Sequence, residues 1–480
     1  MLKVSDIAPL VLVLVMGVLS VPSFGQTPNC GAADLETVDA LQKCHVNKLK
    51  WLEGEKDALQ ARLDMAKNAK EIAAEYFDLG EDSVSHAGVA LLRQAARRGA
   101  KVRIIIDALS SKVSKATLKA LILSSRDKQG HSNLEIRLFN EFSLKNPNLL
   151  GLTHRDHTKM FITDRNYMIV GGRNITCQYF YLCPSQVTFT DLDALVAGPL
   201  AAKAQRENFD ILWNNQKALS PVLFDEKQAL SDKKVQVALG NLNVTFKKLM
   251  ENKLAVRSDS QRNWLKEMTI LNNAEFLHDD PTQDPTLFRF GTPPHQLIAP
   301  ELFRTIARAR QTLTIQTPYL YPDQDTKNLF RHLIANHVHI KIITNSLHST
   351  DNLPVQAGYR SVRDELIKMG IELYEFKGPK TAHGKTAVID NNIVIIGSFN
   401  LDPRSANLNR EIAVVGDSPQ LAQELTHIIE TKFRGNALLV GKDGHPVGTP
   451  ADWDRGVSQK KIDTVNALQT LVLPFIDGQI

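Results

Sequence analysis

Two short stretches of the chain place a lysine two residues after a histidine. The first contains His157 and Lys159, the second contains His383 and Lys385, and each residue of the second follows its counterpart by 226 positions. An imidazole can act as a nucleophile or as a general acid or base, and an ammonium group can hold an anionic oxygen. Two such pairs facing one cleft suit the cleavage of a phosphodiester, because the lysines supply positive charge at the phosphoryl oxygens without a metal ion.

The frame shared by the two stretches extends beyond the histidine and the lysine. Asp164 and Asp390 each follow the lysine by five positions. The segments Gly171-Gly172-Arg173-Asn174 and Gly397-Ser398-Phe399-Asn400 then end on an asparagine, again 226 positions apart. Five matched positions in register indicate that the chain contains two copies of one unit.

The residues around each copy predict two strands joined by a turn. Side chains alternate along a strand, so the histidine and the lysine of each copy are expected on one face. Asp164-Arg165-Asn166 and Asp390-Asn391-Asn392 are turn-forming sequences. The apolar runs 168–170 and 393–396 predict buried return strands. Each copy is therefore expected to carry its histidine and lysine on the first strand and its asparagine at the end of the second.

Strand and helix patterns alternate on both sides of these hairpins. In the first half, strands are predicted at 72–79, 102–106 and 134–139, and a helix at 84–98 ends at Gly99. The second half repeats this order, with predicted strands at 312–316, 338–344 and 371–376. Strand, helix and strand in this order imply parallel pairing with a right-handed crossover. The alternation in both halves supports a duplicated α/β fold.

At these residues the chain resembles the phospholipase D superfamily, whose signature is this duplicated HKD motif. Other segments are similar to bacterial cardiolipin synthases, above all to their C-type members. They are Gly171-Gly172-Arg173-Asn174, 189–193, 344–347, 397–405 and Asn409-Arg410-Glu411. The resemblance covers roughly residues 70–215 and 295–480. It implies an α/β fold of two tandem phospholipase D-like domains, each a mixed, mostly parallel sheet flanked by helices, that form a pseudo-two-fold dimer within one chain.

The resemblance also implies a role for each residue of the motif. The residues expected to be catalytic are His157, Lys159, Asp164, His383, Lys385 and Asp390. By the habit of the family, His157 is expected to attack phosphorus and His383 to protonate the leaving oxygen. The residues expected to bind the substrate phosphate are Asn174, Asn400, Gly172 and Ser398. Asp191 and Glu411 are expected to orient the histidines. Neither a metal ion nor a cofactor is expected.

The function implied is phosphatidyl transfer from a glycerophospholipid through a covalent phosphohistidine. With water as acceptor the product is phosphatidic acid, and with phosphatidylglycerol it is cardiolipin; the motif alone does not choose. A nuclease of the same superfamily and an inactive membrane-binding protein are the alternatives. No nucleic acid partner is expected, because the chain lacks a dense basic segment interleaved with stacking aromatic residues. A monomer is expected, because both motifs lie in one chain.

The composition is that of a globular protein, with 43% hydrophobic and 23% charged residues and a formal net charge of +5. That mild positive excess fits an anionic partner, although solvated lysines give the same value. The predicted organisation is a signal peptide at 1–25, a helical N-terminal extension at 26–70, a first domain at 71–216, a connection at 217–295, a second domain at 296–435 and a C-terminal tail at 436–480. The apolar segment 471–476 of the tail is expected either to touch lipid or to pack on the second domain.

The N-terminus predicts export. Lys3 precedes an apolar run at 8–21, and small residues follow at Ser23 and Gly25. An uncleaved anchor and a buried helix are the alternatives. We expect a periplasmic or secreted protein that is soluble or peripherally attached to a membrane.

The four cysteines fall into two close pairs. Cys30 lies near Cys44, and Cys177 lies near Cys183. In an exported chain both pairs can form disulfides, with four reduced thiols as the alternative.

Overall fold

The computed structural model describes most of the chain, with gaps at several loops and at both ends. The described residues are 30–31, 35–127, 129–142, 153–182, 187–251, 256–257, 259–285, 298–444, 446–447 and 456–472. The predicted signal peptide, Cys183 and the side chains of the apolar segment 471–476 lie outside this description.

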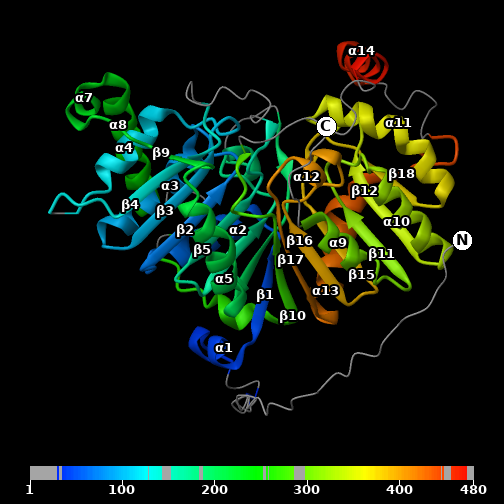
Figure 1. Ribbon diagram of the computed structural model, residues 1–480, viewed down its shortest axis with the longest axis horizontal. Helices are drawn as coiled ribbons and strands as arrows, with labels where there is room; N and C mark the ends of the chain where they lie inside the picture. The colour runs from blue at the N-terminus through cyan, green and yellow to red at the C-terminus, as the bar shows by residue number, and fades with distance from the viewer. Residues whose placement is uncertain are drawn as a thin grey trace, which may run out of the picture.

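The strands of the described residues form one long sheet that runs through both halves of the chain (Figure 1). The first half contributes β2 (Glu71–Tyr76), β3 (Lys101–Asp107), β4 (Leu134–Phe139), β5 (Lys159–Thr163), β6 (Tyr167–Gly171), β8 (Asp193–Ala197) and β9 (Leu219–Pro221). The second contributes β11 (Thr312–Gln316), β12 (His339–Asn345), β13 (Glu372–Phe376), β15 (Thr386–Ile389), β16 (Ile393–Gly397), β17 (Ile412–Asp417) and β18 (Ala437–Leu439).

Two further strands, β1 (Asn47–Leu52) and β10 (Thr269–His278), lie at the centre and join the halves. The full order is β18-β13-β12-β11-β15-β16-β17-β10-β1-β8-β6-β5-β2-β3-β4-β9. Each half therefore runs outward from the centre in the same order, as two copies related by a pseudo-two-fold axis require. A separate pair of short strands, β7 (Phe189–Thr190) and β14 (Thr381–Ala382), bridges the two halves.

The sequence predicts a helical extension at 26–70 and a connection at 217–295 in which no strand is named. Helices at Val38–Cys44 and Glu55–Lys67 agree with the first prediction in part, but each segment also contributes a strand to the centre of the sheet. β1 pairs with β8 and β10, and β10 pairs with β17. Leu49 and Trp51 are buried and alternate with less buried lysines at 48 and 50. This alternation is the period of a strand. It is short, and the leucines of the helix that follows mask it.

Pairing within the sheet also differs from the expectation of a mostly parallel arrangement. Among the described strands of the long sheet, four neighbouring pairs are parallel, and they join β2, β3 and β4 in one half and β11, β12 and β13 in the other. Eleven pairs are antiparallel. The sheet is mixed, as predicted, but the hairpins that carry the motif make it largely antiparallel.

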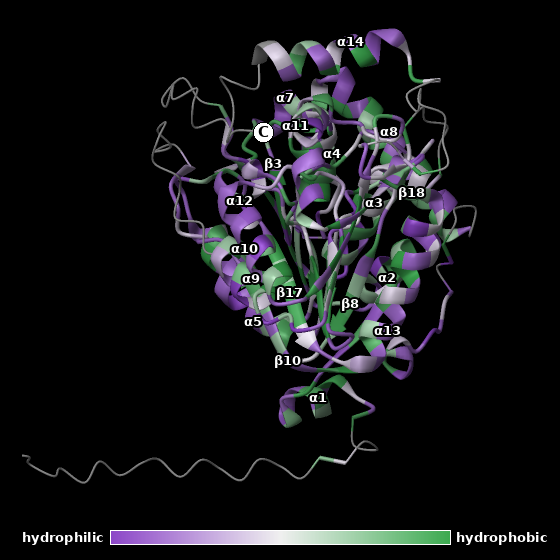
Figure 2. Ribbon diagram, turned by 90° about the vertical axis from the view of Figure 1, so that its right-hand side faces the viewer, coloured by the Kyte–Doolittle hydropathy of each residue, from purple (hydrophilic) through white to green (hydrophobic). Residues whose placement is uncertain are grey.

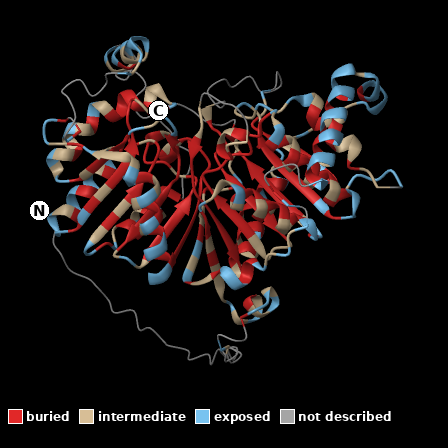
Figure 3. Ribbon diagram, turned by 180° about the vertical axis from the view of Figure 1, so that it is seen from behind, coloured by how far each residue is buried: buried red, intermediate tan, exposed pale blue. Residues whose placement is uncertain are grey.

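Helices cover the sheet, and buried residues follow the strands while exposed residues lie on the outer helix surfaces (Figures 2 and 3). In the first half they are α1 (Val38–Cys44), α2 (Glu55–Lys67), α3 (Ser83–Arg97), α4 (Lys115–Ser124), α5 (Pro199–Ala204), α6 (Asp210–Asn214), α7 (Glu226–Ser231) and α8 (Lys233–Met250). In the second they are α9 (Ile298–Ile306), α10 (Gln324–Ala335), α11 (Leu353–Met369), α12 (Pro403–Asn407), α13 (Pro419–Ile428) and α14 (Gln459–Ala467).

The duplication reaches further than the predicted domain boundaries. α8 begins at Lys233 and α14 begins at Gln459, which is again a spacing of 226 residues. α8 packs on α3 and α4, and α14 packs on α11. The first part of the connection and the C-terminal tail are therefore counterparts in the two copies. One apolar cluster, which includes Met160 and Val388, continues through both halves.

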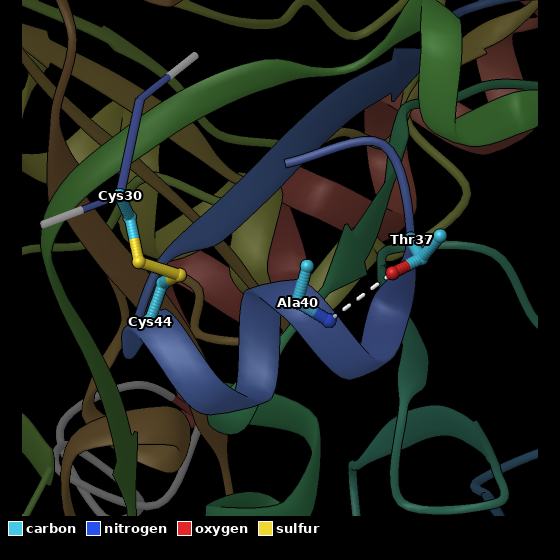
Figure 4. Close-up of a disulfide and its surroundings, with 4 residues drawn as sticks. All are labelled: Cys30, Thr37, Ala40 and Cys44. Carbon is cyan, nitrogen blue, oxygen red and sulfur yellow. Dashed lines mark hydrogen bonds between the residues drawn. A yellow bond between two sulfur atoms is a disulfide. The ribbon is translucent and has the colours of Figure 1, made fainter. Parts of the chain in front are cut away.

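A disulfide joins Cys30 to Cys44 across α1 (Figure 4). The Thr37 hydroxyl caps the same helix by accepting a hydrogen bond from the backbone N–H of Ala40 at 3.2 Å. Cys177 is also disulfide-bonded, while Cys183, its predicted partner, lies outside the described residues. Among the helices that the structure describes, none combines the length and the apolar character that crossing a bilayer requires.

Candidate active site

One cavity of about 250 Å³ is lined by both motif histidines. Its walls come from the first and the second half of the chain, so the predicted convergence of the two copies is confirmed. The lining residues include Phe77, Asp78, His157, Asn174, Tyr179, Tyr319, Asp351, His383 and Asn400.

The backbone ties each histidine to the opposite half of the chain. The N–H of His157 donates to the carbonyl of Arg410 at 3.0 Å, and the N–H of His383 donates to the carbonyl of Thr190 at 2.7 Å. β5 and β15 begin shortly after the two histidines, so these two strands fix where each motif enters the cavity.

Each imidazole also meets a carboxylate from the opposite half. His157 Nδ1 lies 2.9 Å from Glu411 Oε1, and His383 Nδ1 lies 2.7 Å from Asp191 Oδ2. All four side chains are buried. A carboxylate at Nδ1 fixes the ring orientation and its tautomer, which leaves the proton off Nε2. At the second histidine, Nε2 lies 3.3 Å from Lys385 Nζ. The contacts expected of Asp191 and Glu411 are therefore present.

The two lysines lie beside their histidines. Lys159 Nζ donates to the carbonyl of His157 and Lys385 Nζ to the carbonyl of His383, each at 2.6 Å. Burial and then the charge of Lys385 lower the pKa of Lys159 to about 7. Burial lowers the pKa of Lys385 to about 8. Because the charge of Lys385 acts on Lys159, an anion bound near both groups would favour their charged forms.

The same surroundings keep both imidazoles neutral at neutral pH. Burial, followed by the charges of Lys159 and Lys385, lowers the pKa of His157 well below its usual value. Burial and then Lys385 lower the pKa of His383 to about 4. A neutral imidazole has the free electron pair that a nucleophile or a base needs.

The orienting carboxylates differ between the two histidines. Burial raises the pKa of Glu411 to about 7, although the charge of Lys159 opposes this. Burial raises the pKa of Asp191 too, but the hydrogen bond and charge of His383 outweigh it and lower that pKa to about 2. The two halves of the site are thus alike in geometry and unlike in charge.

Both motif asparagines line the cavity. Asn174 Nδ2 donates to the Tyr179 hydroxyl at 3.1 Å, and its Oδ1 accepts from the N–H of Asp78 at 3.2 Å. Asn400 is buried, and within the described residues no donor reaches its Oδ1. Both amides line the cavity, and only their Nδ2 groups can donate to a phosphoryl oxygen.

Gly172 and Ser398, which the sequence assigns to phosphate binding, serve the carboxylates instead. A Cβ atom at Gly172 would lie 2.3 Å from Asp191 Oδ1, so only glycine leaves room for that carboxylate. At the matching position the Ser398 hydroxyl donates to Glu411 Oε2. Neither residue lines the cavity. Their assignment is corrected: they position the acids that hold the histidines.

Asp164 and Asp390 are not brought to the histidines, and their assignment as catalytic residues is corrected as well. Asp164 Oδ1 accepts from the N–H groups of Lys70 and Glu71, each at 2.8 Å. Asp390 Oδ1 accepts in the same way from Gln311 and Thr312. Both sit in turns at the far end of β5 and β15, about 16 Å from the lysines for a strand of this length. They fasten the hairpins to the neighbouring strands.

The sequence analysis left several lining residues out of the site. Phe77 and Tyr179 pack edge-on against His157 and His383, with ring centroids 4.8 and 5.3 Å apart. The Tyr319 hydroxyl donates to Asp351 Oδ1 at 2.9 Å. Phe77 and Tyr319 follow β2 and β11, whose carboxyl ends meet at this edge of the sheet. Their position just after two predicted strands is the feature of the sequence that could have placed them in the site.

The comparison with protein families agrees with this geometry. The family described as "Cardiolipin synthase, PLD-like domain" matches residues 59–213 and 302–432. The chain belongs to this family. It is therefore an enzyme of the phospholipase D superfamily, with one phospholipase D-like unit in each half.

Individual relatives cover most of the chain. Cardiolipin synthase C of Escherichia coli (strain K12) is 29% identical over 413 residues, which are 80% of this chain and 83% of that protein. An uncharacterized protein of Helicobacter pylori (strain ATCC 700392 / 26695) is 29% identical over 407 residues, 77% of this chain and 76% of its own length. The crystal structure of phosphatidylserine synthase from Haemophilus influenzae Rd KW20 matches with a TM-score of 0.58 at 15% identity, covering 88% of this chain and 94% of the other. The last similarity establishes the fold.

Proposed function

We propose that the protein transfers the phosphatidyl group of a glycerophospholipid to water or to an alcohol through a covalent phosphohistidine. The observation that carries the proposal is the pair of imidazoles in one cavity, each held at Nδ1 by a carboxylate from the opposite half. Such an arrangement provides one nucleophile and one acid–base catalyst on opposite sides of a phosphorus atom.

In the first step, Nε2 of His157 attacks phosphorus while His383 gives a proton to the oxygen of the leaving head group. The nitrogen–phosphorus bond forms as the phosphorus–oxygen bond breaks. Asn400 lines the cavity, and Lys159 and Lys385 lie beside the two histidines, so in this proposal the three side chains balance the charge that builds on the phosphoryl oxygens. Because the pKa of free His383 is lowered to about 4, the anionic phosphate of the bound lipid must first raise it so that the imidazole carries that proton.

In the second step, His383 takes a proton from water or from an alcohol, and the resulting oxygen attacks the phosphohistidine. His157 leaves, and the enzyme returns to its starting state. Water gives phosphatidic acid and an alcohol gives a new phosphatidyl ester. The similarity to cardiolipin synthase C supports a second candidate, in which the acceptor is the glycerol hydroxyl of phosphatidylglycerol and the product is cardiolipin.

Three properties of the proposed enzyme extend beyond its chemistry. We propose an exported protein, which the disulfides support because such bonds persist in oxidising compartments. A monomer is supported by the cavity, since both of its histidines come from one chain. Peripheral contact with a membrane follows from a lipid substrate.

The experiment that tests the proposal is product analysis with purified protein. Phosphatidylcholine and phosphatidylglycerol are supplied separately in detergent micelles, with and without added ethanol, in the presence of a chelator. Release of phosphatidic acid, and its replacement by phosphatidylethanol when ethanol is present, is the expected result. Cardiolipin formed from phosphatidylglycerol alone identifies the second candidate. Cleavage of plasmid DNA with no change in either lipid contradicts both.

A further inference from the structure

The two histidines share one backbone arrangement but differ in the side chains behind them. The residue before each histidine forms a parallel bridge with the residue before the orienting acid of the other half. At the first histidine the bridged pair is Asp156 and Arg410; at the second it is Ala382 and Thr190. The positions are equivalent, so the difference in chemistry is a difference between the two half-sites.

Arg410 is a fully buried arginine in the first half-site. Its guanidinium lies 3.7 Å from Asp156 Oδ1 and 3.5 Å from Glu75 Oε1. It also donates to Asn208 Oδ1 at 2.8 Å and to the carbonyl of Asp280 at 3.2 Å. These partners come from β2, the segment before β5, the π-helical turn at 205–209 and the segment after β10. One side chain thus joins both halves and the central strands.

The network reaches His157 and Glu411 through the main chain. The carbonyl of Arg410 accepts from the N–H of His157, and the N–H of Arg410 donates to the carbonyl of Arg155 at 2.8 Å. Glu411 directly follows Arg410 in the chain. A shift of the Arg410 side chain therefore moves both members of the His157–Glu411 pair.

The second half-site lacks this network, position for position. Glu75 pairs across the sheet with Met160, and Gln316 pairs with the equivalent residue Thr386, so Gln316 stands where Glu75 does in the first half. Ala382 occupies the position equivalent to Asp156, and Thr190 occupies the position equivalent to Arg410. Two carboxylates and a guanidinium in one half correspond to an amide, a methyl group and a hydroxyl in the other.

We propose that Arg410, together with Asp156 and Glu75, is a positioning network that holds His157 and Glu411 in the reactive geometry. The inference rests on the proposed function, in which His157 is the nucleophile. The burial of the network supports it, because a guanidinium that makes two hydrogen bonds and lies beside two carboxylates in the interior has little freedom to move. Burial and then the neighbouring Asp156 raise the pKa of Glu75, which disfavours two charged carboxylates beside one guanidinium.

The test transplants the residues of the second half-site into the first. The triple variant Glu75→Gln, Asp156→Ala, Arg410→Thr places at each position the residue that the same fold already accommodates in the other copy. A displacement of about 1 Å in the reacting group is enough to lower kcat about 100-fold. We expect that loss in kcat, with KM changed less than about threefold, in a variant that remains folded. Arg410→Lys, which keeps the charge but cannot reach all its partners, is expected to lose an intermediate amount.

A matched control is Arg103→Met, which removes another largely buried arginine. Arg103 pairs with Glu71 and Asp210 at 2.9 and 2.6 Å, away from the cavity. This variant should melt at a lower temperature and keep its kcat. If the triple variant likewise loses stability but keeps its kcat, the network is structural only and the proposal is overturned. Should the triple variant fail to fold, Arg410→Lys decides by the same criterion.

A second readout separates this inference from the proposed function. The proton on Nδ1 of His157 should give a downfield NMR resonance in the wild type, because it is shared with a buried carboxylate. We expect the resonance to disappear in the triple variant and to persist in Arg103→Met. If the wild type turns over no lipid, the proposed function fails, and the resonance alone then supports or overturns the positioning role.

Discussion

Substituting Gly172 by alanine should disable the second histidine without touching the cavity. The new methyl group would lie 2.3 Å from Asp191 Oδ1 and 2.7 Å from Asp191 Oδ2. Carbon and oxygen normally stay about 3.4 Å apart, so the carboxylate must move by about 1 Å. Asp191 holds His383 Nδ1 at 2.7 Å, and that hydrogen bond cannot survive the movement unchanged.

Two magnitudes follow from this displacement. Overpacking a buried site costs about 1–3 kcal/mol of stability. Misplacing a catalytic group by about 1 Å costs about 100-fold in rate. We therefore expect Gly172→Ala to fold, to melt at a lower temperature and to lose about 100-fold in kcat, with a smaller change in KM.

The assay is phosphatidic acid release from micellar phospholipid, run beside thermal unfolding of the same samples. Gly240→Ala is the matched control. Gly240 lies on the exposed face of α8, where an added Cβ has no neighbour within 4 Å. That change should leave kcat unaltered and stabilise the helix slightly. A Gly172→Ala protein that turns over lipid at the wild-type rate would refute the role given to this glycine.

Three further outcomes are expected. Asp390→Asn should cost about 1–2 kcal/mol of stability, measured by urea unfolding, and leave kcat within about twofold, because its carboxylate binds only backbone N–H groups. Replacing Cys30 and Cys44 by serine should cost about 3 kcal/mol for a crosslink spanning 14 residues and spare the activity of the folded fraction at 25 °C. Finally, the folded pKa of His383 lies below its unfolded value of 6.5, at about 4. The unfolded chain then gains a proton first, so stability falls as pH drops through this window, by about 3 kcal/mol; His383→Asn should flatten that part of the curve, and an unchanged slope would contradict the shift.

The duplicated motif could be predicted from the sequence because it depends on local order. Each histidine and lysine occurs at a fixed spacing, and the hairpin around them has a clear strand period. The contacts of Asp191 and Glu411 could also be anticipated, because the family motif names the acids. The resemblance also implies that Asp191 orients a histidine across the cleft, and its contact with His383 agrees with this. The strands β1 and β10, which join the two copies, could not be predicted in the same way.

The roles predicted for four motif residues are wrong because sequence spacing does not show which way a side chain points. Asp164 and Asp390 sit in turns with positive φ of 52° and 51°, where a short acid binds the backbone. A sequence motif lists them beside the histidine, although the strand between them separates the two groups. For Gly172 and Ser398 the predicted location is right and the predicted role is wrong. They lie close to the site, but they face the carboxylates rather than the cavity.

The central strands were missed because six residues of alternating pattern are a weak signal. β1 runs directly into a helix rich in leucine, and β10 lies in a segment with many breakers. These segments become strands because they pair with strands that are distant in the sequence, β1 with β8 and β10, and β10 with β17. Register between distant strands is set by the assembled sheet, which local patterns do not encode.

The central claim is that His157 carries the phosphatidyl group during turnover. The direct measurement uses a phosphatidyl ester of p-nitrophenol with radiolabelled phosphorus, quenched in alkali after mixing with His383→Ala protein. This leaving group needs no proton, and the variant lacks the base for the second step, so label should accumulate on a peptide that contains His157. His157→Ala protein should acquire none. Label on another residue, or label retained in the His157→Ala protein, would contradict the claim.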